Sequence, residues 1–364
     1  MIVAFDGRPF LGRATGICRY NYCLLQAMRA RYPGIFFKCF ATSLKGGQHS
    51  VFMDLPAENR YRSFIPNRLL NLLWGYTGLL PVERFVGSCD IVHASNYFYI
   101  PHRAGSRYIT TVYDLHFLKF SFKLSRDVRH MLRKRLGAYL ARSQRVITIS
   151  QAVKQEITER FGLPAKHIKV IYPGVTLPPG SPSPPPGARA GGLILSVGQY
   201  TERKNYPLLM SAFLRVKQTL PDARLLIAGP VPAKHKKAVA AWQAKGIVFT
   251  GYLDDTALWR LYRRADLFVL PSVDEGFGMP VVEAQLAGVP TLLSDIPVFR
   301  EISGAASLYC PTGDSAAMAR TIIRLLRDQS LRRQLIARGR KNAGRYTWAA
   351  AADRTVAVYR EVME

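Results

Sequence analysis

The feature that most constrains the fold is a strand, a glycine turn and a helix in immediate succession. Residues 266–270 (DLFVL) form a short apolar run that predicts a buried strand. Gly276 and Gly278 follow it and allow a tight turn and a close approach of the backbone to a ligand. Pro280 suits the first turn of a helix, which residues 288–290 (GVP) end. Because this arrangement gathers unpaired N–H groups at the positive end of a helix, it predicts an anion site, above all for phosphate.

Two carboxylates frame the turn. Glu275 directly precedes the glycines, and Glu283 lies eight residues further on, inside the predicted helix. A phosphate pocket has no need of carboxylates, whereas sugar hydroxyl groups are natural partners for them. One acid on each side of a pyrophosphate therefore predicts contacts with two sugars. Taken singly, Glu283 is also typical of an acid placed near the positive end of a helix, and Glu275 of a solvated loop.

The net charge is unusual for a chain of 364 residues. Lys and Arg number 51 against 24 Asp and Glu, and the formal charge of +27 favours nucleic acid, anionic lipid or phosphorylated small molecules as partners. The apolar run at residues 1–5 is too short for a signal peptide, and we find no run long enough to span a bilayer. Five cysteines, an odd number without metal-ligand spacing, predict reduced thiols in a cytosolic protein.

A Pro/Gly-rich segment divides the chain into two predicted domains. Residues 174–192 predict a linker without a core of its own. On both sides of it, in residues 1–173 and 193–345, strand-like runs alternate with helical periodicities. This alternation predicts an α/β protein with one Rossmann-like parallel sheet in each domain. Residues 44–88 follow the pattern poorly, and their apolar run at 69–74 is interpreted as core rather than membrane contact.

Two segments together resemble the Glu-x7-Glu signature of the retaining family-four glycosyltransferases. They are Glu275-Gly-Phe-Gly-Met-Pro and Glu283-Ala-x-x-x-Gly-Val-Pro. Residues 15–20 (TGICRY) are similar to the TGI-x-RY loop of that family, and the resemblance spans nearly the whole chain. It implies the GT-B fold, in which two Rossmann-like domains face each other across a cleft. It also implies that the last helix, within residues 346–364, crosses back to the N-terminal domain.

The resemblance implies how a nucleotide sugar is bound. Arg203 and Lys204 match the phosphate-binding pair of the family and would neutralise the pyrophosphate, although adjacent basic loop residues are commonly only solvated. Glu275 would orient the hexose and Glu283 the ribose. The other residues that the resemblance implies for donor binding are Gly16, Leu253, Gly276, Phe277, Gly278 and Met279.

The resemblance places the acceptor at strand ends of the N-terminal domain. His93 ends a predicted strand and matches the VH-x-x-N strand end of the family. At the next strand end the family commonly reads T-V-H-D, whereas this chain has Tyr113 before Asp114. Either His116 from the same loop or the hydroxyl group of Tyr113 takes the place of the usual His, and the sequence leaves both open. The predicted catalytic residues are Glu275, Arg203, Lys204 and His116.

Residues 126–145 are strongly basic, with apolar residues at helical spacing. A basic amphipathic helix suits an anionic membrane surface. A solvated helix face over the core explains the pattern equally well.

These observations predict a retaining, metal-independent glycosyltransferase without a cofactor. No Asp-x-Asp triplet is present. By resemblance to bacterial polysaccharide enzymes, we expect GDP-mannose, or a donor of a rhamnose-like hexose, and a glycan or lipid-linked oligosaccharide acceptor at the inner face of the cell membrane. Two other classes stay open. One is a GT-B-fold nucleotide-sugar epimerase, and the other is a basic nucleic-acid-binding protein, which the lack of any recognisable binding module disfavours.

Overall fold

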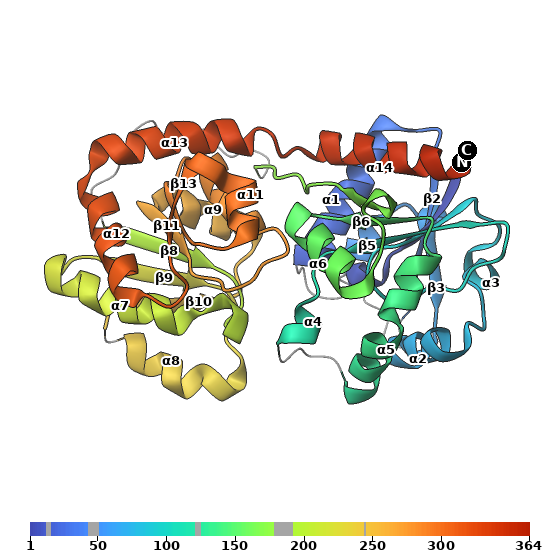
Figure 1. Cartoon of the computed structure of the whole chain (residues 1–364), viewed down its shortest axis with the longest axis horizontal. Helices are drawn as coiled ribbons and strands as arrows, with labels where there is room; N and C mark the ends of the chain where they lie inside the picture. The colour runs from blue at the N-terminus through green and yellow to red at the C-terminus, as the bar shows by residue number, and fades with distance from the viewer. Residues whose placement is uncertain (12–15, 43–50, 121–124, 178–191, 244) are drawn as a thin grey trace. The chain divides into compact units, whose positions relative to one another are not determined.

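The computed structural model describes residues 1–11, 16–42, 51–120, 125–177, 192–243 and 245–364. The chain divides into two compact units (Figure 1). Unit 1 comprises Met1–Gly174 and Thr347–Glu364, and unit 2 comprises Val175–Tyr346. Each unit contains its own parallel sheet, which confirms the predicted α/β class with two parallel-sheet domains.

Unit 1 is built on a sheet whose strand order, within the described residues, is β3-β2-β1-β4-β5-β6-β7. Its strands are β1 (Ile2–Asp6), β2 (Phe36–Thr42), β3 (Arg60–Ser63), β4 (Ile91–Ala94), β5 (Arg107–Val112), β6 (Arg145–Thr148) and β7 (Ile168–Val170). Its α-helices are α1 (Gly16–Arg31), α2 (Asn67–Thr77), α3 (Glu83–Val86), α4 (His116–Lys119), α5 (Arg126–Arg142), α6 (Gln151–Phe161) and α14 (Trp348–Met363). Short 3-10 turns are η1 (Arg8–Leu11), η2 (Val51–Asp54), η3 (Ala57–Asn59) and η4 (Ala165–His167).

The last helix, α14, packs against α1 of unit 1. The ring of Trp348 lies edge-on to Tyr20, and Asp353 accepts two hydrogen bonds from Arg31. The chain leaves this unit at Gly174, where a Cβ atom would lie 2.2 Å from the backbone nitrogen of Trp348. Glycine is required there because the departing chain touches the backbone at the start of α14.

Unit 2 has a six-stranded sheet, within the described residues, in the order β10-β9-β8-β11-β12-β13. Its strands are β8 (Leu193–Val197), β9 (Arg224–Ala228), β10 (Ile247–Gly251), β11 (Leu267–Leu270), β12 (Thr291–Ser294) and β13 (Ser307–Cys310). Its α-helices are α7 (Tyr206–Thr219), α8 (Lys236–Gln243), α9 (Asp255–Arg264), α10 (Met279–Leu286), α11 (Pro297–Ser303), α12 (Ser315–Arg327) and α13 (Gln329–Ala343). Short 3-10 turns are η5 (Glu202–Lys204), η6 (Ala233–His235) and η7 (Gly304–Ala306).

Each sheet has a point where the direction of chain progression reverses. In unit 1 the chain runs from β1 outward to β3 and then restarts at β4, beside β1. In unit 2 it runs from β8 outward to β10 and restarts at β11, beside β8. Open parallel sheets bind ligands outside the carboxyl ends of the strands at such points. The two places to look for chemistry are therefore the loops after β1 and β4, and those after β8 and β11.

The segment that the sequence left unclear contains a helix, α2. Leu70 and Trp74 are buried as core residues, which agrees with the interpretation of the run at 69–74 as core. Leu69 and Tyr76, in contrast, are 58% and 46% exposed. The helix thus has a second apolar face that the core of unit 1 does not cover.

Candidate active site

The loops after β8 and β11 bring three charged side chains together in unit 2. Lys204 Nζ lies 2.6 Å from Glu275 Oε1, and Arg203 Nη1 lies 2.5 Å from Glu275 Oε2. Ser272 Oγ donates a further hydrogen bond to Glu275 Oε1 at 2.8 Å. The backbone joins the same two loops, because the Val273 amide donates to the Arg203 carbonyl oxygen at 2.9 Å. The structure therefore unites three predicted catalytic residues, Glu275, Arg203 and Lys204.

Burial makes the electrostatics of this cluster strong. Lys204 is 6% exposed and Glu275 is 8% exposed, so water screens their attraction poorly. Burial lowers the pKa of the Lys204 ammonium group, while the carboxylate of Glu275 opposes that shift. Two cations share one carboxylate, so these three side chains together carry a net positive charge. Such a site favours an anion with more than one charge, such as a pyrophosphate.

Glycines at strand ends of unit 2 allow close approaches of the chain. Gly198 directly follows β8 with a φ of +148°, and a Cβ atom there would lie 2.6 Å from Lys204 Cε. A Cβ atom on Gly229, φ +153°, would lie 2.2 Å from the carbonyl oxygen of Gly198. Gly278, φ +93°, is the N-cap of α10, whose first turn contains Pro280 as predicted. The first N–H groups of α10 and its dipole therefore face the carboxyl end of β11.

The second signature acid, Glu283, is held by a tyrosine that sequence reasoning missed. Glu283 is 3% exposed on α10, and its Oε2 atom accepts a hydrogen bond from Tyr262 Oη at 2.9 Å. Tyr262 belongs to α9 and is itself fully buried. Its partner lies 21 positions away, a separation that corresponds to no helical or strand period. No sequence pattern could have identified this contact.

The remaining predicted donor residues take varied positions. Gly276 and Phe277 are buried, and the Phe277 ring lies edge-on to Tyr346 at 5.3 Å. Met279, at the start of α10, and Leu253, two residues after β10, are half-buried. Gly16 is the first residue of α1 in unit 1, and the preceding Thr15 of the TGI-x-RY loop lies outside the described residues.

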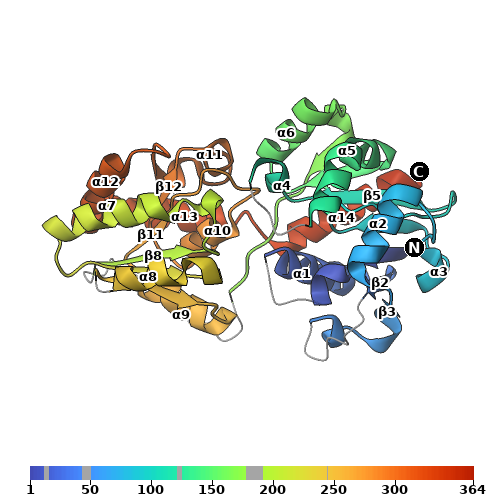
Figure 2. The ribbon, with the colours of Figure 1, turned by 90° about the horizontal axis from the view of Figure 1, so that it is seen from below.

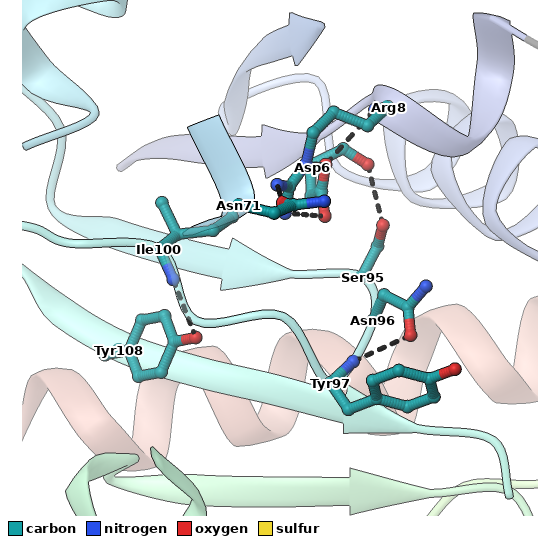
Figure 3. A network of polar contacts seen from close by, with 8 residues as sticks. All are labelled: Asp6, Arg8, Asn71, Ser95, Asn96, Tyr97, Ile100 and Tyr108. Carbon is teal, nitrogen blue, oxygen red and sulfur yellow. Dashed lines mark hydrogen bonds and ion pairs between the residues drawn. The ribbon is translucent and has the colours of Figure 1, made fainter. Parts of the chain in front are cut away.

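Unit 1 has a hollow of about 210 Å³ at the carboxyl ends of β1 and β4, lined by polar side chains and by Pro9, Ile17 and Phe98. Asp6 binds the Arg8 guanidinium through both carboxylate oxygens, at 2.7 and 2.8 Å, and Arg8 Nη1 donates to Asn71 Oδ1 at 2.6 Å (Figure 3). Ser95 Oγ donates to the Asp6 carbonyl oxygen and so ties β4 to β1. Asn96 Oδ1 accepts from the Tyr97 amide at 2.8 Å, with the Asn96 amide nitrogen directed away from Tyr97 (Figure 3).

The charges that line this hollow cancel. The Asp6 and Arg8 side chains are buried and satisfy each other. The amide side chains of Asn67, Asn71 and Asn96 supply the other polar groups of the lining. An uncharged ligand rich in hydroxyl groups matches such a lining, because amides both donate and accept hydrogen bonds. No sequence pattern indicates this network, because its members come from separate elements.

Two predicted acceptor-side residues, His93 and Tyr113, are buried in unit 1. His93 is 1% exposed, with one ring nitrogen bonded to Tyr359 Oη of α14 at 2.6 Å and the other to Thr111 Oγ1 at 2.7 Å. Tyr113 is 4% exposed, and its hydroxyl donates to Asn21 Oδ1 at 2.8 Å. Both side chains are core residues here, because their polar atoms are engaged inside unit 1 and α14 covers His93. Their contact with an acceptor stays a prediction.

The segment after β5 brings Asp114 and His116, the other two predicted residues of unit 1, into contact. His116 Nδ1 lies 3.1 Å from Asp114 Oδ2, and the His116 amide donates to Asp114 Oδ1 at 3.0 Å. His116 is 5% exposed, whereas the Asp114 side chain is 22% exposed. The carboxylate of Asp114 therefore orients the imidazole. Tyr113 and His116 are similarly buried, at 4% and 5% exposure, so both stay predictions for the place of the usual His.

Neither a metal centre nor a membrane span is found within the described ranges. No group of three or more His, Cys, Asp or Glu side chains in them is arranged to hold a metal ion. No helix among them is long and apolar enough to cross a membrane.

Comparison with known families decides the class of the protein. The family described as "Glycosyltransferase Family 4" matches residues 15–177, and "Glycosyl transferases group 1" matches residues 189–342. The chain belongs to glycosyltransferase family 4. The resemblance read from the two signature acids is thereby confirmed. This family 4 chain is 34% identical to the phosphatidyl-myo-inositol mannosyltransferase of Mycobacterium leprae over 48% of each chain, so the match spans about half the length of that relative.

Other relatives match this family 4 member over more of their length. The O-antigen chain mannosyltransferase B of Escherichia coli is 29% identical over 74% of each chain. Sucrose-phosphate synthase from Thermosynechococcus elongatus superimposes with a TM-score of 0.73 at 19% identity, over 99% of this chain and 98% of that one. Anabaena Alr3699/HepE, solved in complex with UDP and glucose, gives a TM-score of 0.70 at 17% identity, over 99% of each chain. At these identities the structures show the fold alone, and they confirm the predicted GT-B class.

Proposed function

We propose that the protein is a retaining glycosyltransferase that transfers a hexose from a nucleotide sugar to a glycan or lipid-linked oligosaccharide during surface-polysaccharide synthesis. The observation that carries this proposal is the buried cluster of Arg203, Lys204 and Glu275 where the strand order of unit 2 reverses. A mannose or rhamnose-like hexose on a GDP carrier is the favoured donor, because relatives named as mannosyltransferases reach 34% and 29% identity. The inner face of the cell membrane is the proposed place of action.

The cluster fits the chemistry of the departing nucleotide. Cleavage of the bond between the sugar and phosphate leaves positive charge on the sugar ring and negative charge on the nucleotide diphosphate. Arg203, Lys204 and the first turn of α10 would stabilise that negative charge. Glu275 holds both cations in place and would bind hexose hydroxyl groups, and Glu283 would accept hydrogen bonds from the ribose.

Retention follows from direct attack on the side of the sugar that the nucleotide leaves. The acceptor hydroxyl oxygen bonds to the anomeric carbon as the carbon–oxygen bond to phosphate breaks, and the hydroxyl proton passes to the departing phosphate oxygen. This route requires neither a protein nucleophile nor a metal ion, since Arg203 and Lys204 supply the positive charge. The amide-lined hollow of unit 1 is the proposed binding site for a neutral sugar of the acceptor, with His116 beside Asp114 as a further polar group of that unit.

Isothermal titration calorimetry with GDP-mannose, UDP-glucose and GDP, in EDTA, tests donor binding. We expect GDP-mannose to bind the wild type and to bind Glu283→Gln at least tenfold more weakly. The control Asp222→Asn, which neutralises an exposed carboxylate of the same unit, should bind like the wild type. NMR of the product should show the anomeric configuration of the donor. Conversion of the donor without an acceptor would instead identify an epimerase, and absence of nucleotide-sugar binding by folded protein would contradict the proposal.

A further inference from the structure

Helices α2 and α5 lie side by side in unit 1 (Figures 1 and 2). Gly75 allows their close approach, because a Cβ atom there would lie 2.0 Å from Met131 Sδ. The Tyr139 hydroxyl of α5 donates to the Gly75 carbonyl oxygen, and Arg68 pairs with Asp127 at 2.5 Å. The two helices therefore present one continuous, firmly held surface.

The α2 part of this surface is apolar. Leu69, Leu73 and Tyr76 recur at i, i+4 and i+7, so they share one face, which lies beside and not on the core-facing side of Leu70 and Trp74. Leu69 is 58% exposed and Tyr76 is 46% exposed. The turn that follows α2 adds Leu79, which is 60% exposed, and Leu80. Five of the eleven large apolar side chains exposed among the described residues fall between positions 64 and 80, so this is a patch and not scattered exposure.

The α5 part is basic. Arg126, His130 and Arg133 have the same i, i+4, i+7 spacing and are exposed. Together with Tyr76, Asp127 and Arg129 they line an open hollow of about 650 Å³. Asp127 adds no net negative charge to it, because Arg68 neutralises its carboxylate. Tyr76 belongs both to the apolar stripe and to the basic hollow, and the Arg135 guanidinium lies 5.2 Å from its ring centroid.

The arrangement favours one of the two interpretations of residues 126–145, a solvated helix face over the core. The apolar residues of α5 face the core of unit 1 and cannot enter a membrane. They are Val128, Met131, Leu132, Leu136 and Leu140. The exposed apolar side chains come instead from α2 and the turn after it.

We propose that the exposed faces of α2 and α5, with the turn at Leu79 and Leu80, form a docking surface for an anionic phospholipid bilayer. The leucines and Tyr76 enter the boundary between headgroups and acyl chains, and the arginines of α5 bind lipid phosphates. The charge of +27 attracts the whole protein to such a surface. Nucleic acid would use the arginines but would leave exposed leucines without a partner. This inference rests on the proposed function in one respect: a lipid-linked acceptor would require the protein to bind the membrane.

Co-sedimentation of the full chain with vesicles tests the surface. We expect binding to phosphatidylcholine vesicles that contain about one third phosphatidylglycerol, and at least tenfold weaker binding to pure phosphatidylcholine. Arg126→Gln/Arg133→Gln should weaken binding to the anionic vesicles about tenfold, and so should Leu69→Gln/Leu79→Gln. The affinity for GDP-mannose, measured by calorimetry, should not change in either variant. That second readout separates failure of the docking surface from failure of the proposed function.

A matched control distinguishes binding through this surface from attraction by the net charge of the whole protein. Arg320 and Arg327 of α12 are exposed and have the same i, i+7 spacing, without an exposed large apolar side chain on that helix. Arg320→Gln/Arg327→Gln should bind vesicles nearly as well as the wild type. Equal loss in the α5 and α12 variants would overturn the proposal in favour of a net-charge effect. Binding to a DNA duplex that Leu69→Gln/Leu79→Gln retains, without vesicle binding, would assign the surface to nucleic acid.

A single variant with a fluorescent reporter tests the same surface if a double variant does not fold. Leu79→Trp places an indole at the exposed turn. With anionic vesicles, its added fluorescence should shift to shorter wavelength and be quenched by lipids brominated on the acyl chain. An unchanged spectrum in the presence of bound vesicles would exclude this face from the membrane contact.

Discussion

The ammonium group of Lys204 lies 2.6 Å from a carboxylate oxygen of Glu275, 71 positions further along the chain. Both side chains are more than nine-tenths buried. Desolvation of two charges is costly unless each compensates the other, and here Arg203 and Ser272 complete the set of partners for the carboxylate. The buried Glu275 carboxylate is thus paired with two cations, and it links the loops after β8 and β11 that form the proposed donor site.

Substitution at the two ends of this pair should change GDP affinity in opposite directions. Lys204→Met removes a cation and should weaken GDP binding at least tenfold. Glu275→Gln leaves both cations and should bind GDP as tightly as the wild type or more tightly. Glu275→Gln should lower the free energy of unfolding by about 3–5 kcal/mol, because the buried Lys204 loses its partner, whereas Lys204→Met should lower it less, because Arg203 and Ser272 still bind Glu275. Urea denaturation and GDP calorimetry measure the two effects, and weaker GDP binding by folded Glu275→Gln would contradict this account.

Tyr262 should act as a positioning residue through Glu283. Tyr262→Phe removes the hydroxyl that donates to Glu283 Oε2 at 2.9 Å, at a cost of about 1–3 kcal/mol in unfolding free energy. We expect several-fold weaker binding of GDP-mannose because the carboxylate loses its fixed orientation. Tyr309→Phe is the matched control, since its hydroxyl donates to the Gly304 carbonyl oxygen at 2.7 Å, away from Glu283. Similar losses of donor affinity in both variants would show that Tyr262 has no specific role.

The candidate donor site could largely be predicted from sequence, because its parts are local. The apolar run, the two glycines and Pro280 are enough to specify a strand, a turn and a helix. Helix α9 (Asp255–Arg264) is local in the same way, because the Asp254 side chain caps its first turn. Patterns that repeat within one element can be read without knowledge of the rest of the chain.

What could not be predicted depends on contacts between distant segments. The strand-end position of His93 indicated access to a ligand, but α14 returns from the end of the chain and covers it. The pairing of Arg8 with Asn71 spans 63 positions and follows no period. Strand β12 and helix α2 were also missed. The strand has only two apolar residues, between Thr291 and Ser294, and the helix is apolar on two faces, so neither shows a usable hydrophobic pattern.

In unit 2, alanine should destabilise the protein more at Gly229, which lies against the backbone of Gly198, than at Gly313, which has free space at its Cβ position. In Gly229→Ala, the new Cβ atom would lie 2.2 Å from the backbone oxygen of Gly198, at a φ of +153°. Backbone cannot move aside as a side chain can, so we expect a loss of about 2 kcal/mol or more in unfolding free energy. Gly313→Ala is the control, because no atom lies within 4 Å of its Cβ position. Equal unfolding free energies for the two variants would contradict the predicted close approach.

His93 should make stability depend on pH. Burial lowers its pKa to about 3, an effect that the charge of Asp6 opposes only in part, whereas an unfolded histidine titrates near pH 6.5. Below pH 6.5 the unfolded chain therefore binds a proton that the folded protein does not. The unfolding free energy should then fall as the pH decreases from about 6.5 towards 3, with a contribution from His93 of up to about 1.4 kcal/mol per pH unit.

Urea denaturation at several pH values between 7.5 and 4.5 measures this contribution. His93→Gln should be less stable than the wild type at pH 7.5, because it loses a hydrogen bond to Tyr359 or Thr111. Its disadvantage should shrink as the pH falls, since Gln does not titrate. His130→Gln, at an exposed position on α5, should keep the wild-type slope. A constant difference between His93→Gln and the wild type at every pH would show that the buried imidazole is not the group that titrates.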